Sequence, residues 1–547
     1  MMPTVSVSHR DICKLLRRQI GPEKLRERLS LLGVEVDEIV GDEIKLEVAH
    51  NRPDLLGPEG VARALKGFLG IEVGLPKYKL RNSGVVVEVD ESTKAIRPYI
   101  VAGVIQDVKF NDENVAALMQ IQDKLHDTLG RNRRRGSIGV YDLDKIKSPV
   151  RYTTTLPEGL RFRPLDFDRE LTPAQILREH PRGVQYGSIM QGWIHYPLLI
   201  DSAGVVLSMP PIVNSEDTRV TSDTKRLFID VTGDDERTVN RILTIMMTSL
   251  AERSFDLQSV AIKYPTKSVR TPNLKATKQR LRAAAVNEFL GLNLKPKDVV
   301  TLMKRMRFDA ASAAEVLTVS VPPYRSDVMH EIDLIEDLAI AYGYDKLMPT
   351  LPNVVTVGEK HPIERLSKKA RDVMVGLDFM EVMTYTLTNP NINFKLMHTS
   401  GEAATIANPI SEEYTIVRNW LLPSLLCIMR ENRRNPLPLQ IFEVGDVVQL
   451  HPETETGAVN VRKVAAATIG GQANFTYIRA IAEALLRELG ITYEFRAIEH
   501  PSFIEGRAAE FLVKNKRIGI IGELHPEVIL GFELEHPVVA FEFDLLG

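Results

Sequence analysis

The chain has 547 residues, of which 44% are hydrophobic and 26% charged, with a formal net charge of −3. This length predicts three or four domains with substantial cores, and the small net charge means that nucleic-acid binding would need local basic patches. The two cysteines exclude a disulfide framework and a Cys-rich zinc site. No signal-peptide pattern and no apolar run near the ~20 residues that span a bilayer are present. We expect a cytoplasmic protein without a membrane segment.

The first segment, residues 1–95, predicts two short helices, a hairpin and a third helix. Ser8 is placed to cap the first helix and Pro22 opens the second, while residues 34–48 alternate around a Gly-Asp turn. The run 50–60, HNRPDLLGPEG, precedes a helix that ends near Phe68. His50 beside Asn, Arg and Asp could form a ligand cluster, but we favour a proline turn whose polar side chains bond to exposed backbone groups.

The second segment, residues 96–268, reads as mixed α/β. Four arginines within residues 131–135 are equally consistent with a phosphate-contacting patch and with a solvated charged loop. Further on, residues 227–233 alternate as a strand, which places Asp230 and Thr232 on one face. Asn214 and Glu216 lie in a polar stretch typical of turns and caps. By themselves these four residues indicate structure rather than chemistry.

The third segment, residues 269–350, predicts helices around one strand at residues 316–321. Thr277 is expected to cap a helix that ends at Leu290, and Pro296 opens another. Two prolines then precede a helix with Ser326 or Asp327 as its cap and Gly343 at its exit. Its predicted apolar face consists of Ile332, Ile335, Ala339 and Tyr342.

Asp333, Glu336 and Asp337 stand at i, i+3 and i+4 of this helix, with Asp327 just ahead. Like charges at this spacing repel by roughly 0.2–0.5 kcal/mol per pair, so either water screens them or a cation binds them. Hard oxygen ligands suit Mg2+, which keeps several waters and takes few carboxylates. The alternative is a solvated acidic face with Asp327 as a cap, and spacing alone favours this alternative.

The fourth segment, residues 351–547, predicts another α/β domain. We expect helices at residues 364–375 and 476–489 and strands at residues 379–387, 441–448, 518–524 and 538–543. Ser411, followed by Glu412 and Glu413, is a helix-start signal. The chain contains no phosphate-binding P-loop, no paired His-Glu metalloprotease motif and no nucleophile elbow.

The run Pro323-Tyr324-Arg325-Ser326-Asp327, the three following acids and residues 341–345, AYGYD, resemble the B5 domain of the phenylalanyl-tRNA synthetase beta subunit. The archaeal and eukaryotic cytosolic type is the more similar. In that family the four acids Asp327, Asp333, Glu336 and Asp337 bind Mg2+ at a boundary shared with the alpha subunit. The run 50–60 resembles the B1 segment, which is structural and contacts the partner subunit.

The resemblance extends to the other segments and implies an α+β multidomain fold. Residues 1–95 would be a B1-like domain, 96–268 the B3/B4 tRNA-editing domain, 269–350 the B5 domain and 351–547 an inactive class II synthetase-like antiparallel-sheet module. The last segment lacks the motif 2 arginines and the Gly-rich motif 3 with which class II enzymes hold ATP and stabilise charge at its α-phosphate. We therefore expect adenylation on the alpha subunit.

The implied function is that of the beta subunit of an α2β2 phenylalanine–tRNA ligase. The alpha subunit would make most of the ATP contacts, while this chain supports assembly, tRNA(Phe) placement and hydrolysis of mischarged Tyr-tRNA(Phe). The predicted editing pocket consists of Asn214, Glu216, Asp230 and Thr232. Two alternatives are a free-standing hydrolase of misacylated tRNA and a non-enzymatic RNA-binding scaffold.

Overall fold

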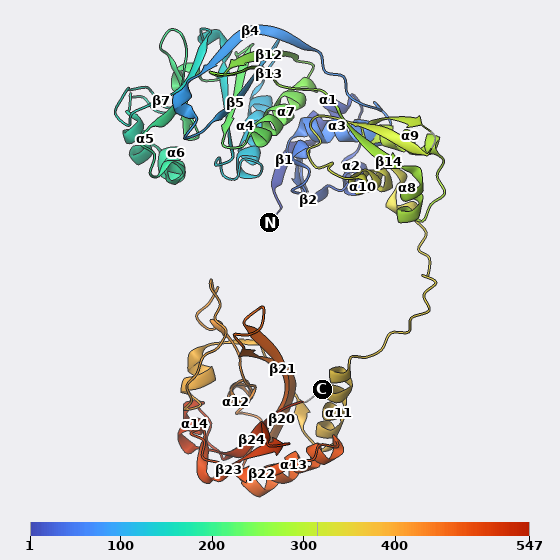
Figure 1. The fold of residues 1–547 in the computed structure, drawn as a ribbon, viewed down its shortest axis with the longest axis vertical. Coiled ribbons are helices and arrows are strands. Elements are labelled where there is room, and N and C mark those ends of the chain that lie inside the picture. The colour runs from blue at the N-terminus through green and yellow to red at the C-terminus, as the bar shows by residue number, and fades with distance from the viewer. Residues whose placement is uncertain (1, 314, 546–547) are drawn as a thin grey trace. The chain divides into compact units, whose positions relative to one another are not determined.

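The computed structural model describes residues 2–313 and 315–545. These residues fold as two compact units, Met1–Leu351 and Pro352–Gly547 (Figure 1). Among the described helices, none is long and apolar enough to cross a membrane.

The N-terminal part of the first unit contains the three predicted helices and the predicted hairpin, and an unpredicted strand, β1, extends the hairpin to a three-stranded antiparallel sheet. Its elements are β1 (Thr4–Ser8), α1 (His9–Leu16), α2 (Pro22–Leu31), β2 (Glu35–Val40), β3 (Glu43–Glu47) and α3 (Pro58–Phe68), with the strands in the order β1-β3-β2. The Ser8 side chain accepts the N–H of Asp11, which confirms the predicted cap of α1.

The run 50–60 forms the predicted turn, a 3-10 turn at Pro53–Leu55. Our expectation for its polar side chains is wrong, however, because Arg52 and Asp54 bind each other. Arg52 Nε donates to Asp54 Oδ1 at 2.8 Å and Arg52 Nη2 donates to Oδ2 at 2.9 Å, and the Asp54 side chain is 1% exposed. A buried carboxylate requires such a charged partner.

A mixed sheet of ten strands forms the centre of the first unit. It contains β4 (Leu80–Val89), β5 (Tyr99–Gln106), β6 (Gly136–Asp142), β7 (Val150–Thr155), β8 (Tyr196–Ile200), β9 (Val206–Met209), β10 (Val213–Asn214), β11 (Leu227–Gly233), β12 (Asp256–Lys263) and β13 (Ser268–Thr271). The pairs β12–β4 and β4–β7 are parallel and the others antiparallel. Strand β4 belongs to this sheet, although its residues precede position 96.

Helices α4 (Asp112–Asp127) and α7 (Glu236–Ala251) cover one face of this sheet, where Leu118 and Leu243 pack against Ile229 of β11 in a common core. Two further short helices, α5 (Pro173–Glu179) and α6 (Pro181–Tyr186), pack near β8 and β9, where Ile176 joins a separate cluster with Leu198. This arrangement leaves β6, β9, β10 and β11 to shape one side of a cavity.

The third part of the first unit contains β14 (Thr277–Arg282), α8 (Ala283–Leu290), α9 (Pro296–Arg305), β15 (Asp309–Ala313), β16 (Val316–Val321) and α10 (Glu331–Tyr342). Pro296 opens α9 and residues 316–321 form a strand, as predicted. Thr277 does not cap a helix: it begins β14, which pairs with β16 along its whole length and buries Leu281. Tertiary pairing therefore outweighs the local cap signal, and α8 begins only after β14 has ended.

Helix α10 begins at Glu331 rather than after Ser326 or Asp327. His330 is its N-cap, and the Asp333 carboxylate accepts the N–H groups of Met329 and His330, both at 2.7 Å. Asp327 does not cap the helix, and its carboxylate instead accepts hydrogen bonds from Arg325. Gly343 ends the helix with a φ of +106°.

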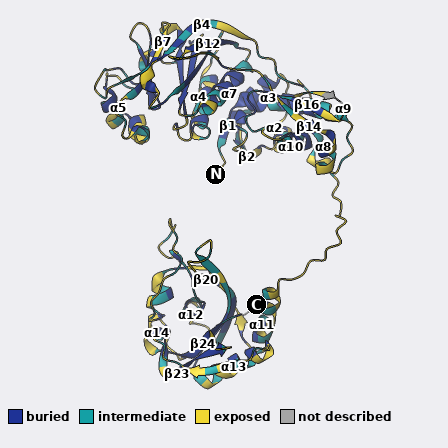
Figure 2. Ribbon diagram, viewed as in Figure 1, coloured by how far each residue is buried: buried dark blue, intermediate teal, exposed yellow. Residues whose placement is uncertain are grey.

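The apolar face of α10 agrees with the prediction at Ile335 and Ala339 but is rotated from it elsewhere. Ile332 is 46% exposed, whereas Leu334 and Leu338 are fully buried beside Ile335 and Ala339. The buried leucines and Ile335 join one continuous core that includes Leu16 and Leu243 and runs through all three parts of the first unit. Figure 2 shows this buried interior.

The second unit is built on a seven-stranded sheet in the order β17-β20-β21-β25-β24-β23-β22, antiparallel except for the parallel pair β17–β20. The strands are β17 (Met380–Glu381), β20 (Leu439–Leu450), β21 (Ala458–Ile469), β22 (Glu494–Ala497), β23 (Phe503–Val513), β24 (Lys516–Leu524) and β25 (Val538–Asp544), with a separate pair β18 (Leu387–Thr388) and β19 (Ile416–Val417). Helices α11 (Pro362–Gly376) and α13 (Phe475–Glu488) pack on one face, and α12 (Leu422–Glu431) and α14 (Pro526–Gly531) on the other.

Two predictions in this unit are wrong. The expected strand over residues 379–387 is reduced to two residues at each end, and Met383 and Tyr385 between them are 93% and 78% exposed. Alternation alone cannot make a strand where no neighbouring strand supplies hydrogen bonds. Ser411 caps a turn by accepting the N–H of Glu413, and the following helix begins only at Leu422, with Pro423 in its first turn.

The continuous core predicts that damage in α10 spreads through the first unit. Leu338→Ala should lower the free energy of unfolding by about 2–5 kcal/mol, because it leaves a cavity in a fully buried position. Hydrogen exchange should then accelerate in β1–β3 and α7 as well as in α10. Ile332→Ala, on the exposed face of the same helix, is the control and should stay within about 0.5 kcal/mol. Faster exchange confined to α10 would contradict a shared core.

Candidate functional site

A cavity of ≈ 380 Å³ opens in the ten-stranded sheet domain. Its walls come from α4, β6, β9, β10 and β11 and from Pro210 and Pro211, which follow β9. It mixes apolar and polar side chains, as ligand pockets do. Of the four residues predicted for an editing pocket, Asn214 and Asp230 line this cavity, and Glu216 and Thr232 do not.

A buried carboxyl on strand β11, the neighbour of the edge strand β6, lines the cavity. Asp230 lies opposite Gly139 of β6 and Ala102 of β5, and it is 1% exposed. The Tyr141 hydroxyl donates to Asp230 Oδ1 at 2.6 Å and lies 2.8 Å from Ser208 Oγ of β9. Three strands thus place three oxygen-bearing side chains in one hydrogen-bonded cluster.

Burial determines the protonation of this cluster. It raises the pKa of Asp230 to about 7, against the lowering effects of the Tyr141 hydrogen bond and the charge of Arg97. Burial likewise raises the pKa of Tyr141 well above its usual value, and the neighbouring Asp230 adds to this. The carboxyl therefore changes its charge near neutral pH, while the phenol stays protonated as a donor.

Gly139 makes this cluster possible. A Cβ atom at position 139 would overlap the Tyr141 hydroxyl and Asp230 Oδ1, closer than non-bonded atoms can approach. A glycine on β6 is thus required for Tyr141 and Asp230 to meet across the sheet.

Another wall of the cavity carries a neutral histidine and a buried arginine. His126 of α4 accepts the N–H of Ile138 at Nε2, 2.8 Å away, and burial lowers its pKa to about 4. Arg133 Nη1 donates to the carbonyl of Ile212 at 2.9 Å, and its guanidinium lies 4.4 Å from the centre of the Tyr186 ring. Arg133 is therefore part of the cavity wall rather than of an exposed phosphate patch.

The other predicted pocket residues support these walls. Arg97 Nε donates to the Thr232 hydroxyl at 3.0 Å, and the same guanidinium donates to the carbonyls of Arg133 and Arg134. Thr232 thus acts through Arg97, which holds the arginine-rich turn. On strand β11, Asp230 and Thr232 share the face opposite to Ile229, as predicted, since Ile229 lies in the core under the helices.

Glu216 lies outside the cavity and braces two of its lining residues. Its carboxylate accepts the N–H of Asp166 at 3.0 Å and binds Arg219 Nη1 at 3.0 Å. Although burial opposes the change, the hydrogen bonds from Asp166 and Arg219 lower the pKa of Glu216. Asp166 and Arg219 both line the cavity.

The four acids predicted to bind Mg2+ occupy three different environments. Asp327 and Asp337 both bind Arg325: Nη2 lies 2.6 Å from Asp327 Oδ2 and 2.5 Å from Asp337 Oδ2, and all three side chains are less than 10% exposed. Asp333 accepts the backbone N–H groups at the start of α10. Glu336 is exposed.

The Arg325 cluster continues into the N-terminal part of the chain. Although burial alone would lower the pKa of Arg325, Asp337 and Asp327 raise it well above its usual value. Burial would raise the pKa of Asp54, but Arg52 and, more weakly, Arg325 hold it below its usual range. The Arg63 guanidinium of α3 lies 3.5 Å from the centre of the Tyr324 ring, next to Arg325 in the chain.

The arrangement fits a divalent ion in part. Carboxylate oxygens are the ligands that Mg2+ prefers, and two of them already converge on one cationic nitrogen. That cation is Arg325, so Asp327 and Asp337 would reach a metal only by releasing or sharing the guanidinium. Asp333 and Glu336, one turn apart on the outer side of α10, are the accessible donors.

Sequence reasoning missed most partners of these acids. Tyr141, Ser208 and Gly139 lie in ordinary strand patterns, and nothing in their spacing connects them with Asp230. Arg325 lies two residues before Asp327 in the motif that resembles the B5 domain. This proximity was the one sequence signal that could have indicated an ion pair between them.

Four family models match the chain in order. They are the Phe-tRNA synthetase beta subunit B1 domain over residues 2–71, the B3/4 domain over residues 98–263, the tRNA synthetase B5 domain over residues 279–344 and the phenylalanyl tRNA synthetase beta chain CLM domain over residues 347–545. The chain is also 43% identical over 536 residues to the phenylalanine–tRNA ligase beta subunit of Archaeoglobus fulgidus, a match that covers 97% of this chain and 96% of that protein. It belongs to the phenylalanine–tRNA ligase beta-subunit family.

Other members of this family are similar over the full length. The beta subunit of Methanothrix thermoacetophila is 41% identical over 549 residues, and that of Methanocaldococcus jannaschii is 39% identical over 550 residues, each match covering all of both proteins. The crystal structure of an N-terminal fragment of the Pyrococcus horikoshii phenylalanyl-tRNA synthetase beta subunit matches with a TM-score of 0.61 and 38% identity. It covers 62% of this chain and 99% of that fragment.

Membership in the beta-subunit family confirms the predicted α+β multidomain fold and the function. The chain is the beta subunit of an ATP-dependent phenylalanine–tRNA ligase and carries a B3/4 editing domain. As a beta subunit it has an alpha subunit and tRNA as partners. Full-length similarity to ligase subunits goes against a free-standing hydrolase and a non-enzymatic scaffold.

Because Asp230 is buried, we expect the stability difference between the natural chain and Asp230→Asn to depend on pH. The folded chain holds the Asp230 proton up to about pH 7, whereas an unfolded Asp releases it near 3.8. The stability from this group is therefore full below about pH 4 and is lost as the pH rises to about 7. Asp230→Asn should gain stability relative to the natural chain over this window, by up to about 4 kcal/mol at 1.36 kcal/mol per pKa unit.

Urea unfolding of both proteins between about pH 3.5 and 8 measures this difference, since this range includes both the unfolded and the folded pKa of Asp230. Asp223→Asn, an exposed position on the loop before β11, is the control and should show no such trend. A constant difference between Asp230→Asn and the natural chain would mean that Asp230 is ionised throughout.

Proposed function

We propose that the cavity of the B3/4 domain binds the aminoacyl group of mischarged Tyr-tRNA(Phe) and supports hydrolysis of its ester bond. Asp230 and Asn214 face the aminoacyl group, while Thr232 and Glu216 position the walls through Arg97, Asp166 and Arg219. The observation that carries this proposal is the buried, hydrogen-bonded cluster of Asp230, Tyr141 and Ser208 that lines the cavity.

The physical reason is the hydroxyl that distinguishes tyrosine from phenylalanine. An apolar synthetic pocket rejects an added hydroxyl only about 100-fold, whereas a site built to bond a hydroxyl rejects the analogue without it by roughly 10⁴–10⁵. A buried carboxyl beside a phenol and a serine offers both donors and acceptors to a substrate hydroxyl. A phenylalanyl group would leave such groups without a partner, which is costly in a desolvated site.

Deacylation of Tyr-tRNA(Phe) by the complex of this chain with its alpha subunit tests the proposal. Asp230→Ala should lower the deacylation rate about 100-fold or more, because it removes the hydroxyl-binding carboxyl. Phenylalanine-dependent ATP–pyrophosphate exchange should stay unchanged, since we place adenylation on the alpha subunit. Asp223→Ala is the matched control. A deacylation rate retained by Asp230→Ala would rule out this cavity as the editing site.

We further propose an α2β2 assembly in the cytoplasm, with Mg2+ at the α10 surface where the alpha subunit docks. Asp333 and Glu336 would supply its accessible oxygens, and Asp327 and Asp337 would complete the set by sharing Arg325. When bound, the ion would supply a positive charge that bridges acids of the two subunits. The residues of this chain would orient the donors, and Arg325 would keep the two buried acids together.

Asp333→Asn combined with Glu336→Gln should weaken association with the alpha subunit about 10-fold and reduce the Mg2+ dependence of that association, because both variants lose the charge that binds the ion. The amides keep the shape of both side chains, and the amide oxygen at position 333 would still accept the backbone N–H groups that start α10. Subunit titration with and without Mg2+ measures both effects, with Glu331→Gln as a control on the same turn. Affinity and Mg2+ dependence equal to those of the natural chain would exclude a metal bridge at this surface.

A further inference from the structure

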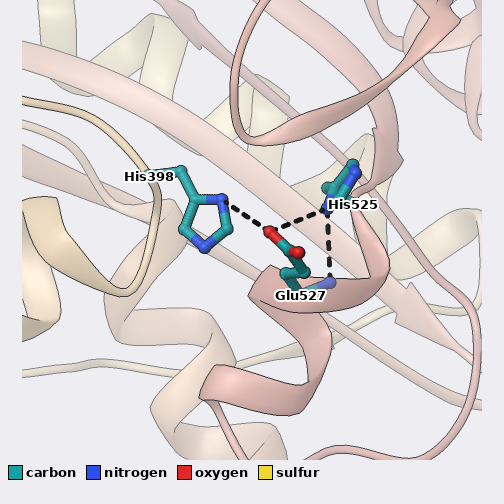
Figure 3. Close-up of side chains that lie close together, drawn as sticks. All are labelled: His398, His525 and Glu527. Carbon is teal, nitrogen blue, oxygen red and sulfur yellow. Dashed lines mark hydrogen bonds and ion pairs between the residues drawn. The ribbon is translucent and has the colours of Figure 1, made fainter.

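The second unit contains a cluster of two histidines and a glutamate, none of which belongs to the cavity or to the acids of α10. His398 follows the π-helical turn Asn391–Lys395, and His525 and Glu527 lie at the start of α14. Glu527 Oε2 lies 3.7 Å from His398 Nδ1 and 3.9 Å from His525 Nδ1 (Figure 3). One ligand atom from each of the three residues lies within 4.8 Å of the other two.

These separations are close to those that a tetrahedral metal requires. Zinc bonds to imidazole nitrogen and carboxylate oxygen of about 2.0–2.2 Å place neighbouring ligand atoms about 3.4 Å apart. The two distances to Glu527 Oε2 exceed this value by about 0.3 and 0.5 Å. The two imidazole nitrogens lie within 4.8 Å of each other, so side-chain rotation has to bring all three ligand atoms closer together. His398 and Glu527 are exposed and His525 is half-buried, so the side chains can move and an ion can enter.

The backbone around the cluster is held in place, although the side chains are accessible. Ser502, which is fully buried, donates through its hydroxyl to the carbonyl of Met397, and its own carbonyl accepts the N–H of His525. One residue thus ties the segment before His398 to the residue that caps α14. Met397 and Val528 are both buried in the core on this face of the sheet. The ligand positions are therefore fixed relative to one another, although they lie far apart in the sequence.

Without a metal ion, the cluster consists of a helix cap and two long ion pairs. His525 Nδ1 accepts the N–H of Glu527 at 3.3 Å, a long cap, and exposed ion pairs at 3.7 and 3.9 Å contribute little. The partial positive charge at the start of α14 opposes a cation, but this helix has only six residues and Glu527 supplies a full negative charge. Because the cap is long and the ion pairs are weak, the imidazole nitrogens and the carboxylate remain available to a metal ion.

We propose that His398, His525 and Glu527 form a binding site for a divalent transition-metal ion, with Zn2+ as the probe. Imidazole nitrogen favours zinc, copper and nickel over the hard ions magnesium and calcium, so this site differs in chemistry from the acids near α10. Three protein ligands and one water complete a tetrahedral shell. The bound ion links the segment that ends at His398 to α14 and stabilises this side of the second unit.

Zn2+ titration of the untagged full-length chain, freed of metal with a chelator, tests the proposal. The natural chain should bind one equivalent of Zn2+ at micromolar concentration, and Co2+ should give the intense visible absorption of a tetrahedral site. His398→Ala and Glu527→Gln should each weaken binding at least about 10-fold and abolish that absorption, because each removes one of three ligands. His525→Asn should do the same while keeping an acceptor for the start of α14.

His451→Ala, an exposed histidine on another loop of the same unit, is the matched control and should bind Zn2+ as the natural chain does. An excess of Mg2+ should not compete. Zn2+ affinity unchanged in His398→Ala, or equally reduced in His451→Ala, would overturn the proposal, as would the absence of a one-equivalent binding event in the natural chain. The temperature of unfolding should rise with Zn2+ only where binding occurs.

Discussion

The first unit depends on the buried ion pairs that the Arg325 guanidinium makes with Asp327 and Asp337. Charge taken out of water is tolerated only when it is paired, and removing one partner of such a pair costs about 3–5 kcal/mol. Arg325 forms ion pairs with Asp327 in its own loop and with Asp337 on α10. If the loop and the helix separated, at least one of these buried charges would lose its partner. Arg52 with Asp54, and Arg63 on the Tyr324 ring, bring the N-terminal domain to the same place.

The need of a buried charge for a partner also explains why two buried aspartates, Asp337 and Asp230, have different roles. Asp337 binds a guanidinium and is part of a structural ion pair. Asp230 accepts from the Tyr141 phenol, which also bonds to Ser208, and has a pKa of about 7. Both residues are almost fully buried, so the difference comes from the partner that the fold supplies. A carboxyl with a charged partner holds elements together, and one with hydroxyl partners remains able to bond to a ligand.

The elements that sequence predicted well are those whose signals are local. Pro296 and the periodic residues of α13 mark helices by themselves, and the alternation in residues 227–233 placed Asp230 and Thr232 on one face. Two of the errors concern strand pairing, which depends on residues far away in the sequence. Thr277 reads as a cap until β16 pairs with it, and residues 379–387 alternate without a neighbour to make them a strand. Resemblance to the family supplied the domain order, which local patterns cannot give.

The acids of α10 show why spacing alone could not resolve the candidate site. At i, i+3 and i+4 the three carboxylates were expected to share a face, yet Asp333 turns back to the helix start, Glu336 faces solvent and Asp337 points into the core. Helical spacing indicates roughly which face of the helix a side chain lies on. The groups that pack against that face then determine whether the side chain is buried, paired or exposed. For Asp337 that group is Arg325, so a metal ion at this surface must compete with the guanidinium for the carboxylate. Asp333 and Glu336, on the outer side of α10, are the acids that remain accessible to the alpha subunit.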